Sequence, residues 1–386
     1  MKVIRMTLKN WRNFNEVDFP LHDRTYLIGP NASGKSNLLD VLRFLRDIAK
    51  PEGGGLQKAI RDRGGLSKLR CLQARKETEV RIAIELTEET KEGMDLWNYA
   101  IAFKSEGKGL QRPVLLEEKV TKNRRVLLDR PNEQDLSDRE RLTQTALEQI
   151  NANQAFRELA NFLQGATYLH LVPQLLKYGE RIGGSLLEED PFGQGFLERV
   201  CKTPKKTRDS RLNKIQAVLQ TAVPRFKELL FETDPNNGKP HIKARYDHWR
   251  PKGAWQREEE FSDGTLRLIG LLWSLLDGDS LLLLEEPELS LNEAIVQRIP
   301  QMIDSILKRA KNPKRQVLIS THSAAILSNP IDERGVLLLE PEREGTTVRS
   351  PSEEEKTALR AGLTVSEVIL PKTRPQTTKG KGLWDE

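Results

Sequence analysis

The segment from Gly29 to Ser36, with the sequence GPNASGKS, constrains this chain more strongly than any other stretch. Two glycines separated by four residues and followed by Lys-Ser have the spacing at which backbone N–H groups wrap around phosphates. In such a loop Lys35 reaches the β- and γ-phosphates and the Ser36 hydroxyl binds Mg²⁺. An apolar run precedes the loop and apolar residues at helical spacing follow it, so a helix N-terminus faces the anion. We therefore expect a phosphate site formed by Gly29, Pro30, Asn31, Ala32, Ser33, Gly34, Lys35, Ser36 and Asn37.

The size and composition of the chain fit a large α/β domain with insertions, or two domains. It has 386 residues, of which 37% are apolar. It contains no run of about 18 uncharged apolar residues, and its first residues do not form a signal peptide. Two isolated cysteines, Cys71 and Cys201, indicate neither disulfides nor a zinc site. We expect a cytoplasmic protein that has no membrane partner.

Positive charge is concentrated in one part of the chain. The formal net charge is +6, whereas residues 201–252 contain thirteen Lys/Arg against five Asp/Glu, a net charge of +8. Smaller basic groups lie at 58–76 and 119–125. These cations either follow the phosphate backbone of double-stranded DNA or form a solvated face, and both interpretations remain open.

Alternating apolar residues predict an antiparallel sheet in the N-terminal third. Residues 1–21 read as a β-hairpin with a polar turn at 13–16, followed by a strand at 24–28. Further alternating or apolar runs occupy 79–86, 96–103, 114–120 and 125–128. We expect this sheet to flank the nucleotide.

The middle of the chain changes to helical periodicity. Ser137 and Glu140 fit a capping box that opens helical faces up to residue 163. Short helices are also predicted at 211–219 and 225–231, with a strand at 166–173. These patterns are too short for an extended coiled coil, so we expect a compact helical lid.

Two buried strands in the C-terminal part end in polar residues. Residues 280–284 are almost all leucine and lead into Glu285 and Glu286, and a second run at 316–320 ends just before His322. An amphipathic helix between them, kinked at Pro300, implies a parallel sheet whose carboxyl ends bind the ligand. There Glu285 would complete the Mg²⁺ sphere through water, Glu286 would act as general base and His322 would contact the γ-phosphate.

A second phosphate-binding segment lies at Phe261 to Thr265. Ser262 and the Gly264 N–H would stand at the N-terminus of a buried helix over 266–276, an arrangement that binds anions. A domain that already holds phosphates at Lys35 does not need this site. This second site is explained if Ser262 contacts the nucleotide bound by another copy of the chain.

These motifs together resemble an ABC-type ATPase of the RecF, SMC and OLD group. The set comprises the NWRNF hairpin, GPNASGKS, SDGT, LLLLEEPELSL and STHS. Within that group it most resembles the stand-alone OLD-like ATPases of bacterial anti-phage defence systems. The resemblance covers 1–103 and 191–339. It implies an α/β ABC-ATPase head, in which a mixed sheet with a P-loop parallel core is flanked by an antiparallel sheet and carries a helical lid insertion.

The resemblance also assigns roles to individual residues. It implies that ATP and Mg²⁺ are the cofactors, that Glu285 is the Walker B carboxylate, Glu286 the catalytic glutamate and His322 the switch histidine. Nucleotide contacts are implied for Arg12, Asn13, Ser262, Asp263 and Gly264. The family's Q-loop glutamine, a metal ligand, matches Gln57 or Gln73, and we favour Gln73. Asn292 stands where this branch often has His, which leaves the D-loop contact open.

The expected organisation has four parts. They are an N-terminal ATPase lobe (1–130), a helical and basic insertion (131–255), a C-terminal ATPase lobe (256–345) and a C-terminal extension (346–386). The expected function is ATP hydrolysis by a head-to-tail homodimer, or a higher even oligomer, that controls a separate effector, a nuclease or toxin. The alternative is a DNA-binding clamp of RecF or SMC type that acts in DNA repair or maintenance.

Overall fold

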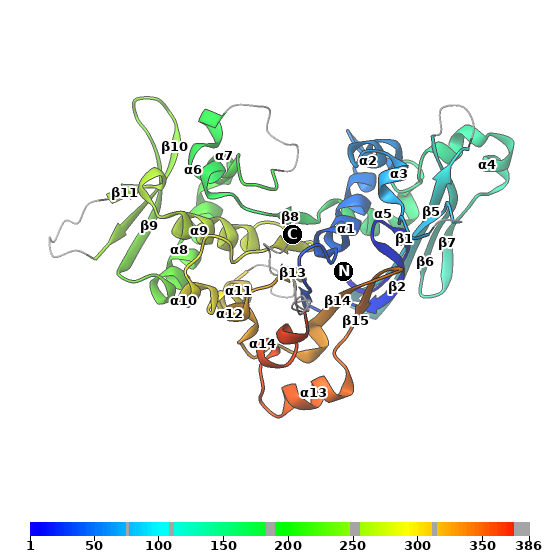
Figure 1. The fold of residues 1–386 in the computed structure, drawn as a ribbon. Coiled ribbons are helices and arrows are strands. Elements are labelled where there is room, and N and C mark those ends of the chain that lie inside the picture. The colour runs from blue at the N-terminus through cyan, green and yellow to red at the C-terminus, as the bar shows by residue number, and fades with distance from the viewer. Residues whose placement is uncertain (75–76, 108–111, 183–189, 248–254, 311–314, 374–386) are drawn as a thin grey trace, which may run out of the picture.

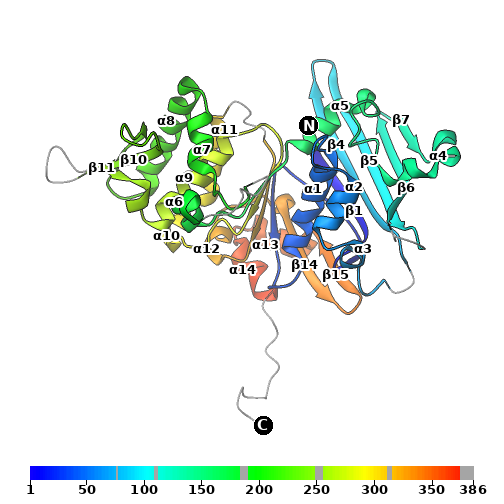
Figure 2. The same cartoon turned by 90° about the horizontal axis from the view of Figure 1, so that it is seen from above.

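The computed structural model describes residues 1–74, 77–107, 112–182, 190–247, 255–310 and 315–373. It has an α/β fold in which a mixed sheet lies between an antiparallel sheet on one side and a group of helices on the other (Figures 1 and 2). The two six-stranded sheets meet where the edge strand β15 contacts β2.

The mixed sheet has the strand order β15-β14-β3-β13-β12-β8, and only the β14–β15 pair is antiparallel. Its strands are β3 (Arg24–Ile28), β8 (Thr167–Leu169), β12 (Leu282–Glu285), β13 (Val317–Thr321), β14 (Val336–Glu342) and β15 (Gly345–Arg349). Successive leucines of β12 enter different hydrophobic clusters: Leu283 packs toward α1, and Leu282 and Leu284 pack toward α9. Both faces of the sheet are therefore covered, which explains the uninterrupted leucine run.

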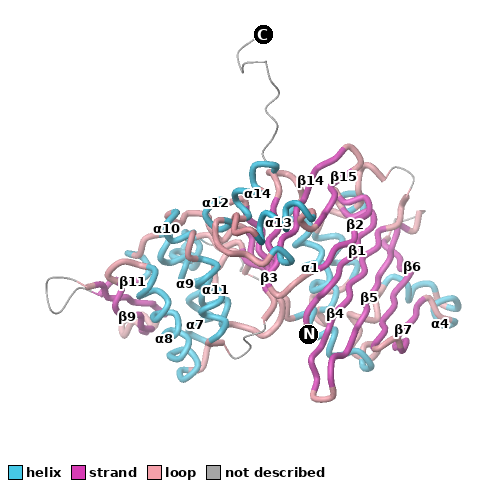
Figure 3. Tube along the Cα trace, turned by 90° about the horizontal axis from the view of Figure 1, so that it is seen from below, coloured by secondary structure: helices cyan, strands magenta, loops and turns pink. Residues whose placement is uncertain are grey.

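The second large sheet is antiparallel, as predicted, with the strand order β2-β1-β4-β5-β6-β7. Figure 3 shows its strands side by side. They are β1 (Lys2–Trp11), β2 (Phe14–Pro20), β4 (Val80–Thr90), β5 (Gly93–Ser105), β6 (Pro113–Lys122) and β7 (Arg125–Arg130). The N-terminal hairpin turns at residues 12–13, slightly earlier than the predicted turn at 13–16.

Helices cover the inner face of this sheet and bury a large aromatic group. They are α1 (Lys35–Ala49), α2 (Leu56–Asp62), α3 (Leu66–Leu69) and α5 (Arg157–Gln164), with α4 (Glu133–Ser137) at the far edge. Phe44 of α1 lies 5.1 Å from the Trp11 ring and 5.5 Å from the Phe103 ring, between centroids. These contacts fix α1, and thus the P-loop in front of it, against the sheet.

The capping box predicted at Ser137 and Glu140 is wrong. Ser137 ends α4 instead, and the box that the structure forms joins Asn132 and Asp135 at the start of that helix. Asp135 fits there because it also receives two hydrogen bonds from the buried Arg130. The segment after it contains short 3₁₀ turns, η1 (Arg139–Thr143) and η2 (Gln154–Phe156), where long helical faces were expected.

The other side of the mixed sheet is covered mainly by helices. These are α6 (Pro173–Ile182), α7 (Phe196–Lys202), α8 (Lys205–Ala222), α9 (Asp263–Leu276), α10 (Glu293–Val296), α11 (Ile299–Lys308) and α12 (Ala324–Leu327). The kink predicted at Pro300 is a break between α10 and α11, because Pro300 lies in the first turn of α11, where its missing N–H costs nothing.

The helix predicted at 225–231 is also wrong, because this segment is a strand. A small antiparallel sheet packs against α8 and consists of β9 (Phe226–Thr233), β10 (Pro240–Tyr246) and β11 (Trp255–Arg257). Leu229 pairs with Ala244, and both are fully buried. Long-range pairing with β10 therefore outweighs the local helical pattern of this segment.

Residues 131–255 do not pack as one unit. Buried residues at 146–168 join the cluster under the antiparallel sheet, and those from 169 onward join the cluster around α9. The C-terminal part adds α13 (Glu353–Arg360) and α14 (Val365–Val368), with short turns η3 (Glu258–Glu260), η4 (Glu333–Gly335) and η5 (Leu370–Thr373) elsewhere. Within the described ranges, the structure contains no helix long and apolar enough to cross a membrane.

Candidate active site

The P-loop connects β3 to α1, and its glycines are required by close contacts. Gly34 caps α1 with a φ of 97°, and a Cβ there would lie 2.1 Å from Nδ2 of Asn13. A Cβ on Gly29 would lie 2.6 Å from both the Leu339 carbonyl oxygen and Oγ of Ser33. The glycine spacing therefore reflects tight packing of the loop against the hairpin and β14.

Lys35 is the first residue of α1 and is 7% exposed. Its ammonium group donates to the carbonyls of Gly29 (2.9 Å) and Pro30 (3.0 Å), which keeps it inside the loop. Burial lowers the pKa of Lys35, whereas the nearby acidic groups Glu286 and Glu285 act in the opposite direction. A poorly solvated cation within a loop that precedes a helix N-terminus is suited to holding a phosphate.

Ser36 and Glu285 come together as expected. The Ser36 hydroxyl donates to Oε1 of Glu285, at the end of β12, and the hydroxyl of Tyr168 on β8 donates to Oε2. A hydroxyl and a carboxylate are the oxygen ligands that Mg²⁺ prefers, together with phosphates and water. The described residues contain no group of three or more His, Cys, Asp or Glu side chains placed to hold a metal ion. This donor set fits Mg²⁺ bound jointly with a nucleotide.

Glu286 and His322 lie at the ends of neighbouring parallel strands. Nδ1 of His322 is 3.1 Å from Oε1 of Glu286, and the Glu286 N–H donates to the carbonyl of Ser320 at 3.0 Å. Glu286 has a φ of 44°, an uncommon conformation for a residue with a side chain. Its carbonyl accepts a hydrogen bond from Arg267 of α9 at 2.9 Å. The backbone turn therefore directs Glu286 differently from Glu285, its neighbour in sequence.

Sequence reasoning missed Glu288 and Tyr168. Glu288 is 8% exposed and accepts a hydrogen bond from the Thr321 hydroxyl at 2.6 Å. Burial raises its pKa, although Thr321 opposes the change. The EEPE motif could have pointed to Glu288 as a third carboxylate. Tyr168 lies in a three-residue strand whose partner is more than 100 residues away, and no local spacing reveals that pairing.

The hairpin residues support the P-loop through side-chain contacts. Asn13 donates to the Ser33 carbonyl at 3.0 Å and accepts from Nδ2 of Asn37 at 2.8 Å. Arg12 donates to Asp40 of α1 at 2.7 Å. The amides of Asn13 and Asn37 thus brace the loop, and contact with the nucleotide remains a prediction for all three residues.

The segment around Ser262 opens α9, as predicted. Oγ of Ser262 accepts from the Thr265 N–H at 3.1 Å, and Asp263 forms an ion pair with Lys177 at 2.7 Å. A Cβ on Gly264 would lie 3.2 Å from the Leu291 side chain, so this turn packs against the segment after β12. Among the described residues, no hydrogen bond or ion pair given by the structure joins this segment to the P-loop.

Three other predicted residues have contacts of their own. Gln57 donates to the carbonyls of Pro113 and Thr143, which places it in the packing of α2. Gln73 is exposed and its Oε1 lies 3.2 Å from the Cys71 sulfur. In the described part of the chain, the structure gives Gln73 no contact with Ser36 or Glu285. Asn292 caps α10 by accepting from the Ala294 N–H at 2.9 Å.

The basic segment 201–252 is partly neutralised by its own sheet. Lys243 pairs with Glu232 at 2.5 Å and Arg245 pairs with Glu228 at 2.6 Å, both across β9 and β10. Tyr246 packs edge-on against Phe226, with centroids 5.4 Å apart. Residues 248–252 of this segment lie outside the described residues.

Comparisons with known proteins agree with this geometry. Residues 24–328 match the AAA_21 family, described as "AAA domain, putative AbiEii toxin, Type IV TA system". A 46-residue segment is 46% identical to the DNA replication and repair protein RecF of Chlamydia caviae and spans 12% of both chains. A 47-residue segment is 45% identical to Endonuclease GajA of Bacillus cereus and spans 12% of this chain and 8% of that relative.

The fold is similar to that of solved SMC head domains. An SMC head bound to the C-terminal winged-helix domain of ScpA matches 92% of this chain and 100% of its own, with a TM-score of 0.55 and 17% identity. An SMC head with an extended coiled coil, bound to a ScpA domain derived from Pyrococcus furiosus, matches 94% and 99%, with a TM-score of 0.52 and 14% identity. The family match over most of the chain shows that the protein belongs to the AAA_21 family, and the segments shared with RecF and GajA, together with this fold, identify it as an ABC-type ATPase of the RecF, SMC and OLD group.

Proposed function

We propose that the chain binds ATP with Mg²⁺ and hydrolyses it only when two copies meet head to tail. The observation that carries this proposal is the position of Ser262 and Gly264 at the N-terminus of the 14-residue helix α9, apart from the P-loop contacts of the same chain. Both helix N-termini, that of α1 and that of α9, suit phosphate. A two-fold arrangement would bring the α9 terminus of one copy to the P-loop of the other.

In this proposal each side chain of the site has a distinct task. Lys35 holds the phosphates and Ser36 with Glu285 holds Mg²⁺, which would neutralise charge on the transferred phosphoryl group. Glu286 accepts the proton of the attacking water. His322, in contact with Glu286, holds that carboxylate in position and addresses the γ-phosphate.

The Glu286→Gln variant tests the proposal directly. This variant should bind ATP, lose turnover and accumulate as a dimer in light scattering with ATP and Mg²⁺. Adding Ser262→Arg should prevent the dimer while leaving ATP bound at Lys35. Ser352→Arg is the matched control, because Ser352 caps α13 with the same contact, a 3.2 Å hydrogen bond from a backbone N–H. A Glu286→Gln protein that stays monomeric at saturating ATP would contradict the proposal.

We further propose that the dimer acts as sensor or scaffold for a separate effector, a nuclease or toxin, in bacterial defence. The support is the toxin-system description of the matched family and the segment shared with the endonuclease GajA. Cells that express this chain with the product of a neighbouring gene should resist phage in plaque assays. Protection that persists with Glu286→Gln would count against control by ATP turnover.

The second candidate, a DNA-binding clamp, is supported by the segment shared with RecF and by the basic stretch 201–252. Neutralisation of Lys243 and Arg245 by acids on β9 weakens this support. Affinity for duplex DNA that falls steeply with salt, and that falls again in Lys205→Gln on α8, would favour the clamp.

A further inference from the structure

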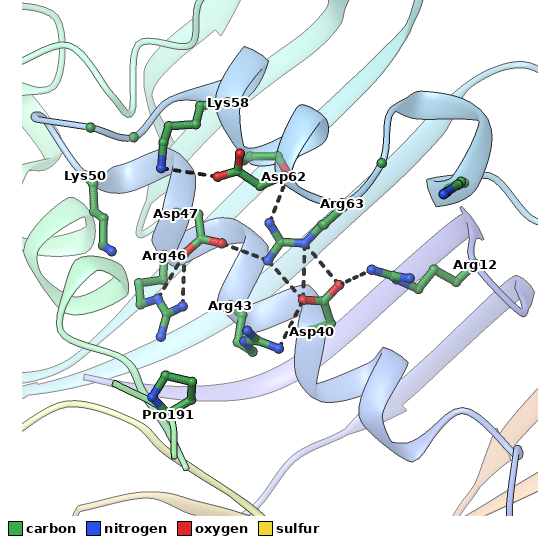
Figure 4. A pocket seen from close by; sticks show the side chains of 15 residues that line it. Arg12, Asp40, Arg43, Arg46, Asp47, Lys50, Lys58, Asp62, Arg63 and Pro191 are labelled. Atoms are coloured by element: carbon green, nitrogen blue, oxygen red, sulfur yellow. Dashed lines mark hydrogen bonds and ion pairs between the residues drawn. The ribbon is translucent and has the colours of Figure 1, made fainter. Parts of the chain in front are cut away.

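A second basic site lies on the outer face of α1, away from the P-loop. A cavity of about 740 Å³ opens between α1, α2, the glycines that follow α1, and Pro191 (Figure 4). Of its fifteen lining residues, seven are Lys or Arg and three are Asp, a net charge of +4. We call this cavity the α1 pocket. Apart from Pro191, Ala59 and three glycines it has no apolar lining, which excludes a predominantly apolar ligand.

The carboxylates of the α1 pocket are shared among several arginines. Asp40 contacts Arg12 at 2.7 Å, Arg63 at 3.0 Å and Arg43 at 3.7 Å. Asp47 is likewise shared, with Arg63 at 2.8 Å among its partners. Figure 4 shows these side chains converging on the two carboxylates. Because Asp40 and Asp47 each contact two or three guanidinium groups, while Asp62 pairs with Lys58, the arrangement retains excess positive charge.

Two donors in this wall are unsatisfied. The Nε atoms of Arg12 and Arg43 are buried and have no hydrogen-bond partner among the described residues. A buried donor without an acceptor costs roughly 1–3 kcal/mol. The side chains of Arg12 and Arg43 are 26% and 31% exposed, and guanidinium groups bind phosphate oxygens in pairs, so a phosphate in the cavity would accept from their exposed nitrogens.

From this wall we propose that the α1 pocket binds a small ligand that carries two or more phosphate groups, separately from the P-loop. The cavity volume lies within the range of small-molecule sites. The pocket residues of α1, Asp40 to Asp47, lie four to eleven residues after Ser36, roughly 6 to 16 Å along the helix axis at the helical rise per residue. The ligand class includes nucleoside polyphosphates and short oligonucleotides, which share the same phosphate chemistry.

Contacts lead from the α1 pocket to the candidate active site. The Arg43 guanidinium lies over the Tyr168 ring, 4.0 Å from its centroid, and Tyr168 donates to Glu285. On the other side, Arg12 precedes Asn13, which binds the Ser33 carbonyl in the P-loop. A ligand that draws Arg43 toward its phosphates therefore acts on the group that orients Glu285. Binding to the pocket itself does not depend on the proposed function.

The test uses the full chain with Lys35→Ala, which removes phosphate binding at the P-loop. Inorganic tripolyphosphate is titrated calorimetrically, and one binding site is expected. Adding Lys58→Gln and Lys68→Gln, two partly exposed pocket residues, should weaken binding at least tenfold. Lys202→Gln with Lys205→Gln removes the same charge elsewhere and should leave affinity within twofold. Thermal melts of all variants show that folding is retained.

Three results would overturn the proposal: no binding by the Lys35→Ala protein, equal losses in the pocket and control variants, or binding of a 30-base-pair duplex without binding of tripolyphosphate. Parallel titrations with ATP and with a five-nucleotide oligonucleotide distinguish the two sources of phosphate. Tighter binding of either one, with the same loss in the pocket variant, supports the site and assigns its ligand.

Discussion

The Tyr168 hydroxyl donates a hydrogen bond to Oε2 of Glu285, across the neighbouring strands β8 and β12. Ser36 donates to the other oxygen of the same carboxylate. Burial, followed by the contact with Glu285, raises the pKa of Tyr168, so the phenol remains a donor at neutral pH. The proposed Mg²⁺ carboxylate is therefore held from two sides, once by the P-loop helix and once by a remote strand.

Removing this phenol should weaken the use of Mg²⁺ rather than ATP binding. Tyr168→Phe loses a hydrogen bond to a charged group, which is worth roughly 1.5–3 kcal/mol. We expect the Mg²⁺ concentration for half-maximal turnover to rise about tenfold, with ATP affinity unchanged, in steady-state kinetics at varied Mg²⁺. Tyr26→Phe removes a phenol from β3 of the same sheet, which does not pair with β8 or β12, and should have no such effect. An unchanged Mg²⁺ dependence in Tyr168→Phe would show that this contact does not position Glu285.

Gly34 in the P-loop can be compared with Gly65 before α3 to test whether a side chain at Gly34 is excluded by steric contact. Both have a positive φ, 97° and 91°, but a Cβ meets Asn13 at Gly34 and nothing within 4 Å at Gly65. Gly34→Ala should abolish nucleotide binding measured with a fluorescent ATP analogue. Gly65 has a ψ of 169°, so Gly65→Ala carries a backbone strain of its own, about 1–3 kcal/mol, and should only lower the melting temperature. Equal binding by both variants would refute the steric argument.

Most of the fold could be predicted because the strongest patterns are local. The glycine spacing at 29–34, the leucines of β12 and the alternation in β4 each depend on residues close in sequence, and the strands they predict are present. The same holds for Ser36 with Glu285 and for Glu286 with His322, since parallel strands end at one edge of the sheet.

The wrong predictions concern segments whose structure depends on contacts with residues far away in the sequence. The segment at 225–231 forms a strand because β10 pairs with it, and residues 131–255 divide between two clusters whose other members lie elsewhere in the chain. Tyr168 contacts Glu285 because β8 pairs with β12, and no local sequence pattern predicts that pairing. Likewise, the spacing of Gln57 and Gln73 could not reveal that the Gln57 side-chain amide donates its hydrogen bonds to the carbonyls of Pro113 and Thr143.

A buried ion pair predicts how stability depends on pH. Asp135 is fully buried against Arg130, whose hydrogen bonds are the main cause that lowers the pKa of Asp135 to about 2. Because its pKa is lowered on folding, ionised Asp135 stabilises the fold at pH values above the ordinary pKa of 3.8. This contribution is lost as the pH falls toward about 2. Asp135→Asn should cost roughly 2–4 kcal/mol at pH 7 and clearly less at pH 3, measured by urea unfolding. A pH-independent cost would contradict this assignment.

Arg267 connects the helix that begins at Ser262 with the turn that carries Glu286. It is 4% exposed, and its guanidinium donates to the Glu286 carbonyl at 2.9 Å. Burial lowers the pKa of Arg267, while Glu288 and Glu286 counteract that effect. A displacement of α9 on dimerisation would therefore move Glu286 directly.

Arg267→Met should free the strained turn at Glu286, whose φ is 44°. We expect kcat to fall roughly ten- to a hundredfold, the value of one hydrogen bond to a charged group, with the Kd for ATP within twofold. Arg298→Met is the control, because Arg298 also donates to a backbone carbonyl, that of Thr221 at 2.5 Å, away from the site. If Arg267→Met instead weakens ATP binding with kcat unchanged, then Arg267 supports the nucleotide and not the catalytic turn. Separate measurements of single-turnover hydrolysis and of ATP binding distinguish these outcomes, because only the catalytic turn changes the first without the second.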